Sequence, residues 1–112
     1  MNPVNNNSTL LSNALDGLAA RHRAVASNLA NQSTPGYKRF EVSFEDQLEK
    51  AQGGGSFSPK VERDMEGGGP DGNNVVPEDE IGALTRVEIL YRTISAAISM
   101  KAALMRRALS NR

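Results

Sequence analysis

The sequence has no cysteine, no tryptophan and a single histidine in its 112 residues. Without cysteine there are no disulfide bonds, no thiolate metal sites and no cysteine nucleophile, and a single histidine excludes a histidine-rich metal site. Aromatic residues are 4% of the chain, so few large rings are present to line a deep ligand pocket. We therefore expect no enzymatic activity, no cofactor and no bound metal.

The chain also has no excess of charge and no long hydrophobic run. It carries 13 Lys+Arg and 13 Asp+Glu, for a formal net charge of zero. This balance gives no general attraction to nucleic acid or to an acidic membrane. No uncharged run is long enough to cross a bilayer, and the first residues lack the pattern of a cleavable signal peptide. Composition alone points to the cytoplasm, but a protein exported without a cleavable signal has the same features.

An apolar stripe with helical spacing follows an Asn-rich start. It predicts a helix over residues 9–31 that buries a narrow seam against another helix. Alanines flank this seam, so a partner can approach closely. We interpret the lone histidine of the stripe as a tolerated polar position, because no catalytic or metal-binding partner accompanies it in the sequence. The stripe, with spacings of four, three, four, three and four, is Leu11, Leu15, Leu18, His22, Val25 and Leu29.

The helical period stops at a turn signal. Thr34 precedes a proline, which disfavours the helical conformation, and Pro35-Gly36 suits the centre of a type II turn. Apolar and polar residues then alternate in residues 40–44, which predicts one short half-buried strand. A helical turn or two is expected over residues 45–51.

The middle of the chain is rich in glycine. Two glycine runs bracket a charged stretch with few large apolar residues. Such a stretch buries too little surface to offset about 1–2 kcal/mol of backbone entropy per residue, so a flexible linker is predicted. The spacing of its glycines matches neither common phosphate-binding pattern.

A second long helix is predicted over residues 74–112, with acidic residues near its start and basic residues near its end, as the helix dipole favours. It has apolar residues on two faces, which implies more than one neighbour. The main stripe consists of Leu84, Val87, Tyr91, Ile94, Ile98, Met105 and Leu109. The second face carries Ile89, Ala96, Met100 and Leu104.

These segments predict a mainly α fold. Two long terminal helices pack as a helical hairpin or coiled coil around a flexible Gly-rich middle with at most one short β segment. Burying one large apolar residue contributes roughly 1.5–3 kcal/mol, so the first seam is marginal alone and the chain is expected to order fully only among neighbours. The expected segments are a mobile arm (1–8), a first helix (9–31), a turn with a short strand and helical turn (32–51), a linker (52–73) and a second helix (74–112).

Residues 26–39, ASNLANQSTPGYKR, resemble the N-terminal motif of the bacterial flagellar rod and hook family. The motif positions are Asn28, Leu29, Ala30, Asn31, Thr34, Pro35, Gly36 and Tyr37. A second motif and the short chain length resemble the short subunits of the proximal rod. That motif consists of Asp71, Gly72, Asn73, Asn74 and Val75.

The resemblance implies a structural subunit of the proximal rod of the flagellar basal body. Such subunits reach the periplasmic rod through the flagellar type III export apparatus, without a cleavable signal. Their terminal helices form the torque-transmitting shaft. The implied partners are copies of the chain, other rod subunits, and inner-membrane ring or export-gate adaptor proteins. Three alternatives remain open: another rod subunit, a soluble helical adaptor or export regulator that does not polymerise, and a small DNA-binding helical protein.

Overall fold

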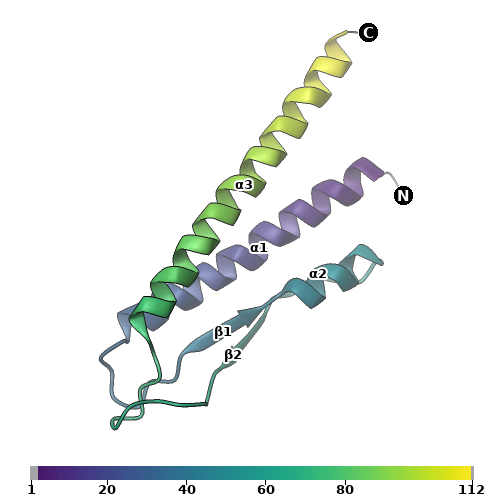
Figure 1. Ribbon diagram of the computed structural model, residues 1–112. Coiled ribbons are helices and arrows are strands. Elements are labelled where there is room, and N and C mark those ends of the chain that lie inside the picture. Colours follow the sequence, from purple (N-terminus) through teal and green to yellow (C-terminus); the bar gives the residue numbers. More distant parts are fainter. Residues whose placement is uncertain (1–2, 112) are drawn as a thin grey trace.

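The computed structural model describes residues 3–111 and shows a mainly helical chain, as predicted (Figure 1). The long helices α1 (Pro3–Ala30) and α3 (Pro77–Ser110) are the first and last elements along the described chain. Between them come strand β1 (Phe40–Ser43), helix α2 (Glu45–Gln52) and strand β2 (Lys60–Arg63).

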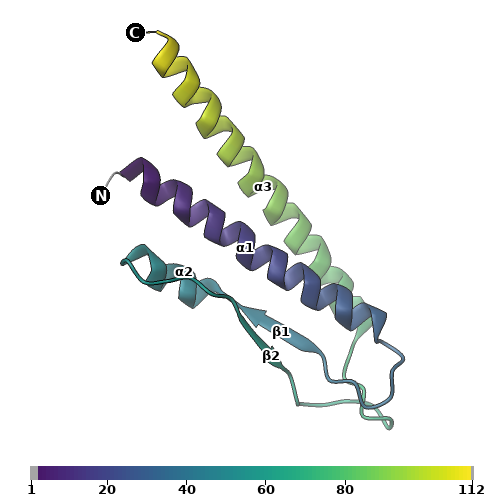
Figure 2. The same cartoon turned by 180° about the vertical axis from the view of Figure 1, so that it is seen from behind.

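The two long helices form an antiparallel hairpin that opens toward the chain ends. In both views α1 lies between α3 and the lobe made by β1, β2 and α2 (Figures 1 and 2). The helices are closest where α1 ends and α3 begins, and they diverge toward the two termini, which lie at the same end of the molecule. The molecule is long and thin, with extents of 67 × 26 × 13 Å. A chain of this shape has little interior.

The small sheet departs from the predicted flexible middle. β1 is the expected short strand, but it pairs antiparallel with β2, with Phe40 opposite Arg63 and Val42 opposite Val61. β2 lies inside the expected 52–73 linker, so flexibility is the wrong description for these four residues. All four residues are exposed, so the sequence shows no alternation of buried and exposed residues that would predict a strand. The strand is stabilised by its hydrogen bonds to β1.

The helix boundaries also differ from expectation. α1 begins at Pro3, so residues 3–8 of the expected mobile arm are helical, while residues 1–2 and Arg112 lie outside the described residues. Proline suits a first helical turn, and each asparagine costs at most about 0.7 kcal/mol in a helix. α3 begins at Pro77, after an extended Val76, and not at residue 74. Asn74 does not cap the helix, because its side chain bonds the Arg39 N–H and the Asp64 carbonyl instead.

The core is small and centred on α1. Its buried side chains are Leu18, Ala20, Ala24, Val42, Phe44 and Val87. The Phe44 ring lies directly on Gly17, where an added Cβ atom would collide with it. Glycine at this position therefore allows the β1 end to sit close against α1.

The predicted helix seam is buried only along part of its length. Leu18 (1% exposed), Val25 (3%) and Val87 (3%) are enclosed within the chain itself. The half-buried seam positions are Leu11, Leu15, Leu29, Leu84, Ile94 and Ile98. Toward the C-terminus, Tyr91 (43%), Met105 (45%) and Leu109 (58%) are exposed. Packing therefore loosens where the helices diverge.

Candidate functional site

The closed end of the hairpin is joined by a polar network with a buried centre. We call this network the basal clasp, and it is made of Asn28, Asn31, Thr34, Tyr37, Arg39, Asn73, Asn74 and Glu80. It brings together the two sequence motifs, residues 28–37 and 71–75, and adds Arg39 and Glu80 to them.

Asn28 is the centre of the clasp and is completely buried. Its Oδ1 accepts a hydrogen bond from the Phe40 backbone N–H at 2.8 Å, and its Nδ2 donates to the Phe40 carbonyl at 2.9 Å. The same Oδ1 accepts from the Tyr37 hydroxyl at 3.1 Å. The Asn28 amide thus pairs with β1 as a neighbouring strand would, and it fixes β1 on α1.

Glu80 connects the first turn of α3 to this centre. It is 1% exposed and accepts from Asn28 Nδ2 at 3.2 Å and from Arg39 Nε at 2.6 Å. The hydrogen bond to Glu80 raises the pKa of Arg39 above its ordinary value, against the effect of burial. Because both carboxylate oxygens of Glu80 are paired, its charge is tolerated inside the molecule.

The second motif secures the end of α1. Asn73 Nδ2 donates to the backbone carbonyls of Asn31 at 2.9 Å and Thr34 at 2.8 Å, and its Oδ1 accepts from the Val75 N–H at 2.8 Å. Carbonyls at a helix C-terminus lack partners within the helix. The Asn31 carbonyl, just beyond α1, already accepts from the Thr34 N–H at 3.0 Å, so the Asn73 side chain adds a second donor and holds the turn in place.

Asn74 and two glycines complete the clasp. Asn74 Oδ1 accepts from the Arg39 N–H at 2.7 Å, and its Nδ2 donates to the Asp64 carbonyl at 2.6 Å. Gly36 and Gly72 have φ angles of +75° and +85°, a conformation that glycine adopts readily. The Gly36 N–H donates to the Asp71 carbonyl at 2.8 Å, so the two turns lie against each other.

Sequence reasoning identified both motifs but not the residues that link them. Glu80 was assigned to the helix dipole. A signal was nevertheless present: Glu80, Leu84, Val87 and Tyr91 are spaced four, three and four apart. The carboxylate thus continues the apolar stripe and lies on the face that packs against α1.

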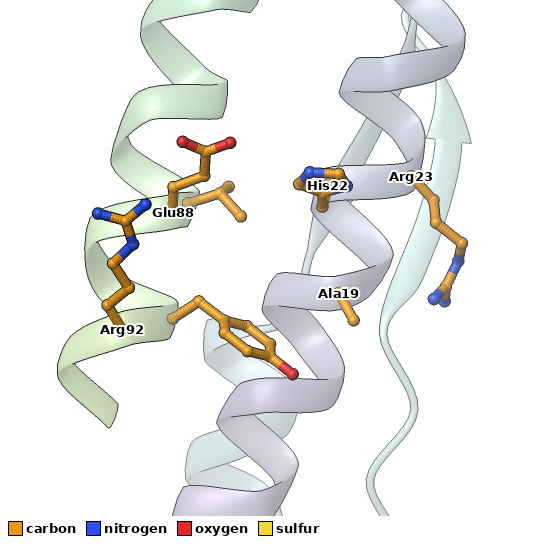
Figure 3. Close-up of a pocket in the computed structure, with 7 residues that line it drawn as sticks. Ala19, His22, Arg23, Glu88 and Arg92 are labelled. Carbon is orange, nitrogen blue, oxygen red and sulfur yellow. The ribbon is translucent and has the colours of Figure 1, made fainter. Parts of the chain in front are cut away.

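His22 lies on the side of α1 that faces α3 (Figure 3). It is exposed at the edge of the predicted seam and lines an open groove of about 440 Å³ between α1 and α3. It projects from α1 toward α3, whereas Arg23 points away from the gap (Figure 3). Among residues 3–111, no group of three His, Cys, Asp or Glu side chains is placed to hold a metal ion.

A second candidate surface lies on α3, away from α1. Residues 93–100 carry no charge, and three large apolar side chains on this face, which we call the outer face, are exposed: Ile89 (59%), Met100 (65%) and Leu104 (56%). Near the chain ends, the diverging helices leave a groove of about 300 Å³, lined by Leu11, Ser12, Leu15, Ile98, Lys101, Ala102 and Met105. Apolar surface of this kind marks an interaction site.

The outer face does not make α3 a membrane helix. Within the described part of the chain, no helix combines the length and the apolar character needed to span a bilayer.

Comparison with known proteins shows which family part of the chain is similar to. Residues 11–38 match the family described as flagella basal body rod protein. This segment covers most of α1, the turn and part of the basal clasp, and it confirms the resemblance to the flagellar rod family.

Curated relatives narrow the assignment within that family. The chain is 49% identical over 37 residues to the flagellar basal body rod protein FlgB of Borreliella burgdorferi, and equally to that of Borrelia hermsii. The matched segment is 33% of this chain and 27% of the length of each relative. Over this segment, the chain is similar to the FlgB type of flagellar basal body rod protein.

Proposed function

We propose that the chain is a structural subunit of the flagellar rod, in its proximal part, and that it assembles through its two long helices into the torque-transmitting shaft. It acts by packing and has no catalytic step. Its partners are copies of itself, other rod subunits and the proteins at the base of the rod. The family match and the FlgB relatives support this role.

The observation that carries the proposal is the exposed outer face of α3. Ile89, Met100 and Leu104 are each more than half exposed, although the helix packs on α1 with its other side. Fully burying such a side chain contributes about 1.5–3 kcal/mol. Covering this face with a neighbouring helix therefore gives a substantial driving force for assembly. A discrete globular protein rarely exposes an apolar face of this kind.

The basal clasp supports the same role by a different route. Torque passes through a shaft only if each subunit keeps its shape under load. The clasp ties the end of α1, β1 and the start of α3 together through buried hydrogen bonds and the Arg39–Glu80 ion pair. We infer that the clasp sets the angle between α1 and α3, and that neighbouring subunits pack against these two helices.

The test places a charge on the outer face without disturbing the fold. Met100→Glu and Leu104→Glu, alone and combined, are introduced into a deletion strain whose swimming is restored by the parent gene, and swimming and rod formation are measured. We expect both to be lost in the double variant. Ser99→Glu, also exposed on α3, is the matched control and is expected to swim. Leu18 of the predicted seam is not a suitable position for this test. Its side chain is 1% exposed inside the chain's own core, so a charge there would disturb folding as well as assembly.

Circular dichroism of the purified variants separates assembly from folding, since all four should match the parent chain. Normal motility of the double variant would contradict assembly through the outer face. A soluble adaptor would be indicated instead if basal bodies purified from the complemented strain contained none of the chain. Labelling the chain in such basal bodies tests its place in the proximal rod.

A further inference from the structure

The two edges of the β1–β2 sheet differ in their hydrogen bonding. The edge of β1 is closed by α1 side chains. Asn28 bonds both backbone groups of Phe40, at 2.8 and 2.9 Å, and Arg21 donates to the Val42 carbonyl from Nη2 at 2.8 Å and Nε at 3.2 Å. No further strand can pair on this side.

The edge of β2 is open. The backbone N–H and C=O of Phe40 and the C=O of Val42 point toward α1 and bond its side chains. Phe40 and Val42 are therefore the positions of β1 that make no hydrogen bonds to β2. Their partners in the register, Arg63 and Val61, therefore direct their N–H and C=O groups away from β1. These groups point outward along a strand whose four residues are all exposed.

An apolar groove follows this open edge. Val61 is 54% exposed, although the Val42 side chain opposite it is buried. Together with Ala20, Arg23, Ala24, Ser27 and Phe40, Val61 lines a groove of about 230 Å³ between β2 and α1. An added strand would place inward-facing side chains in this groove.

We propose that the open edge binds β2 of a second copy of this chain, antiparallel, with Val61 opposite the second copy's Val61. The two valines exchange both backbone hydrogen bonds, and the Arg63 N–H donates to the carbonyl of the second copy's Pro59. Both valine side chains then fill the grooves beside them. The result is a four-stranded sheet with β1 at both outer edges, where each is closed by its own α1.

Charge selects this register. On the solvent face of the sheet, Glu62 lies opposite Glu41 of β1, and Lys60 Nζ is 3.0 Å from Glu62 Oε1. In the proposed register, Lys60 of each copy lies opposite Glu62 of the other, which is a favourable cross-strand pair. A shift that centres the pair on Glu62 instead opposes two carboxylates.

The helices leave room for this pairing. α1 packs on β1, and neighbouring strands lie about 4.8 Å apart, so two β1 strands at the outer edges are separated by about 14 Å. The α1 helices beneath them are then further apart than the 8–10 Å of direct helix contact. The space between them accommodates the valines and the Arg23 side chains.

The pair is independent of the proposed rod function. A two-fold contact closes on itself and cannot be repeated along a polar shaft, so it belongs to free subunits. It leaves the outer face of α3 uncovered. Loss of the pair should leave motility unchanged, and loss of the outer face should leave the pair intact.

The first test uses the absence of cysteine. In Val61→Cys, the two introduced thiols would lie on Cα atoms about 5.5 Å apart, a separation that a disulfide bridges. Mild oxidation should give a covalent dimer as the main product. Met65→Cys, a residue 67% exposed just beyond β2, is the control for random collision. Equal cross-linking of both variants would overturn the proposal.

The second test reverses the charges. Sedimentation of the full chain at increasing concentration should show a monomer–dimer equilibrium, which Lys60→Glu weakens by about tenfold or more because carboxylates then face each other across the pair. The double variant Lys60→Glu/Glu62→Lys should restore it. A chain that stays monomeric, or a dimer unaffected by Lys60→Glu, would overturn the proposal. Lys60 is exposed, so circular dichroism should show an unchanged fold.

Discussion

The two ends of the helical hairpin are built on opposite principles. At the closed end, polar groups are buried and paired, and Asn28 and Glu80 are almost completely enclosed. At the open end, apolar groups are exposed, including Met105 and Leu109. The closed end is therefore complete within one chain, because buried polar groups need exact partners that a single chain can supply. The open end leaves apolar side chains that nothing in the described chain covers, and under the proposed function neighbouring helices cover them.

The largest effect is expected from breaking the closed end. Glu80→Ala removes the carboxylate that accepts from both Arg39 and Asn28. Because Arg39 is 24% exposed and keeps Asp64 as a partner, the loss should approach but not exceed the cost of breaking a fully buried ion pair, about 3–5 kcal/mol. We expect a chain of this size to lose most of its cooperative unfolding transition, measured by thermal or urea denaturation. Glu78→Ala, an exposed acidic residue in the same helical turn, is the control and should stay close to the parent. Equal stability of both variants would contradict the importance of the clasp.

A smaller loss is expected where β1 meets α1. Gly17→Ala adds a methyl group where the Phe44 ring lies. Alanine favours the helix by about 1 kcal/mol, whereas overpacking costs about 1–3 kcal/mol, so the free energy of unfolding should fall by up to about 2 kcal/mol. The double variant Gly17→Ala/Phe44→Leu should recover part of the loss. A stabilised Gly17→Ala chain would show that the ring moves freely.

The second motif is expected to contribute less than Glu80. Asn73→Ala removes the amide that bonds the carbonyls of Asn31 and Thr34, which should cost about 1–3 kcal/mol. Asn73→Asp keeps the acceptor for the Val75 N–H but cannot donate, so it should lose a similar amount. If the Asp variant retained full stability, the donated bonds to the end of α1 would be unimportant.

The smallest effect on folding is expected at the open end. Met100→Glu changes a side chain that is 65% exposed, so the free energy of unfolding should shift by less than about 0.5 kcal/mol. A large loss would mean that the outer face is used within the chain, and the contrast between the two ends would fail. Urea denaturation of the variant and the parent, measured side by side, decides this.

Sequence reasoning recovered the helices, the turn and the first strand because each carries a local pattern. The stripe through Leu18 and Val25 has a helical period, and Pro35-Gly36 marks the stop. β2 was missed because four exposed residues with one valine have no burial signal. The clasp was missed as a unit because hydrogen bonds between Asn28 and Glu80 join residues 52 positions apart, and no local pattern records such a pairing.

The same separation along the chain has a consequence for biosynthesis. The carboxylate that completes the buried amide of α1 follows that amide by 52 residues in the chain. A nascent polypeptide therefore lacks this closing contact until those residues have been made. The chain stays pliable up to that point and becomes rigid only when the two groups meet.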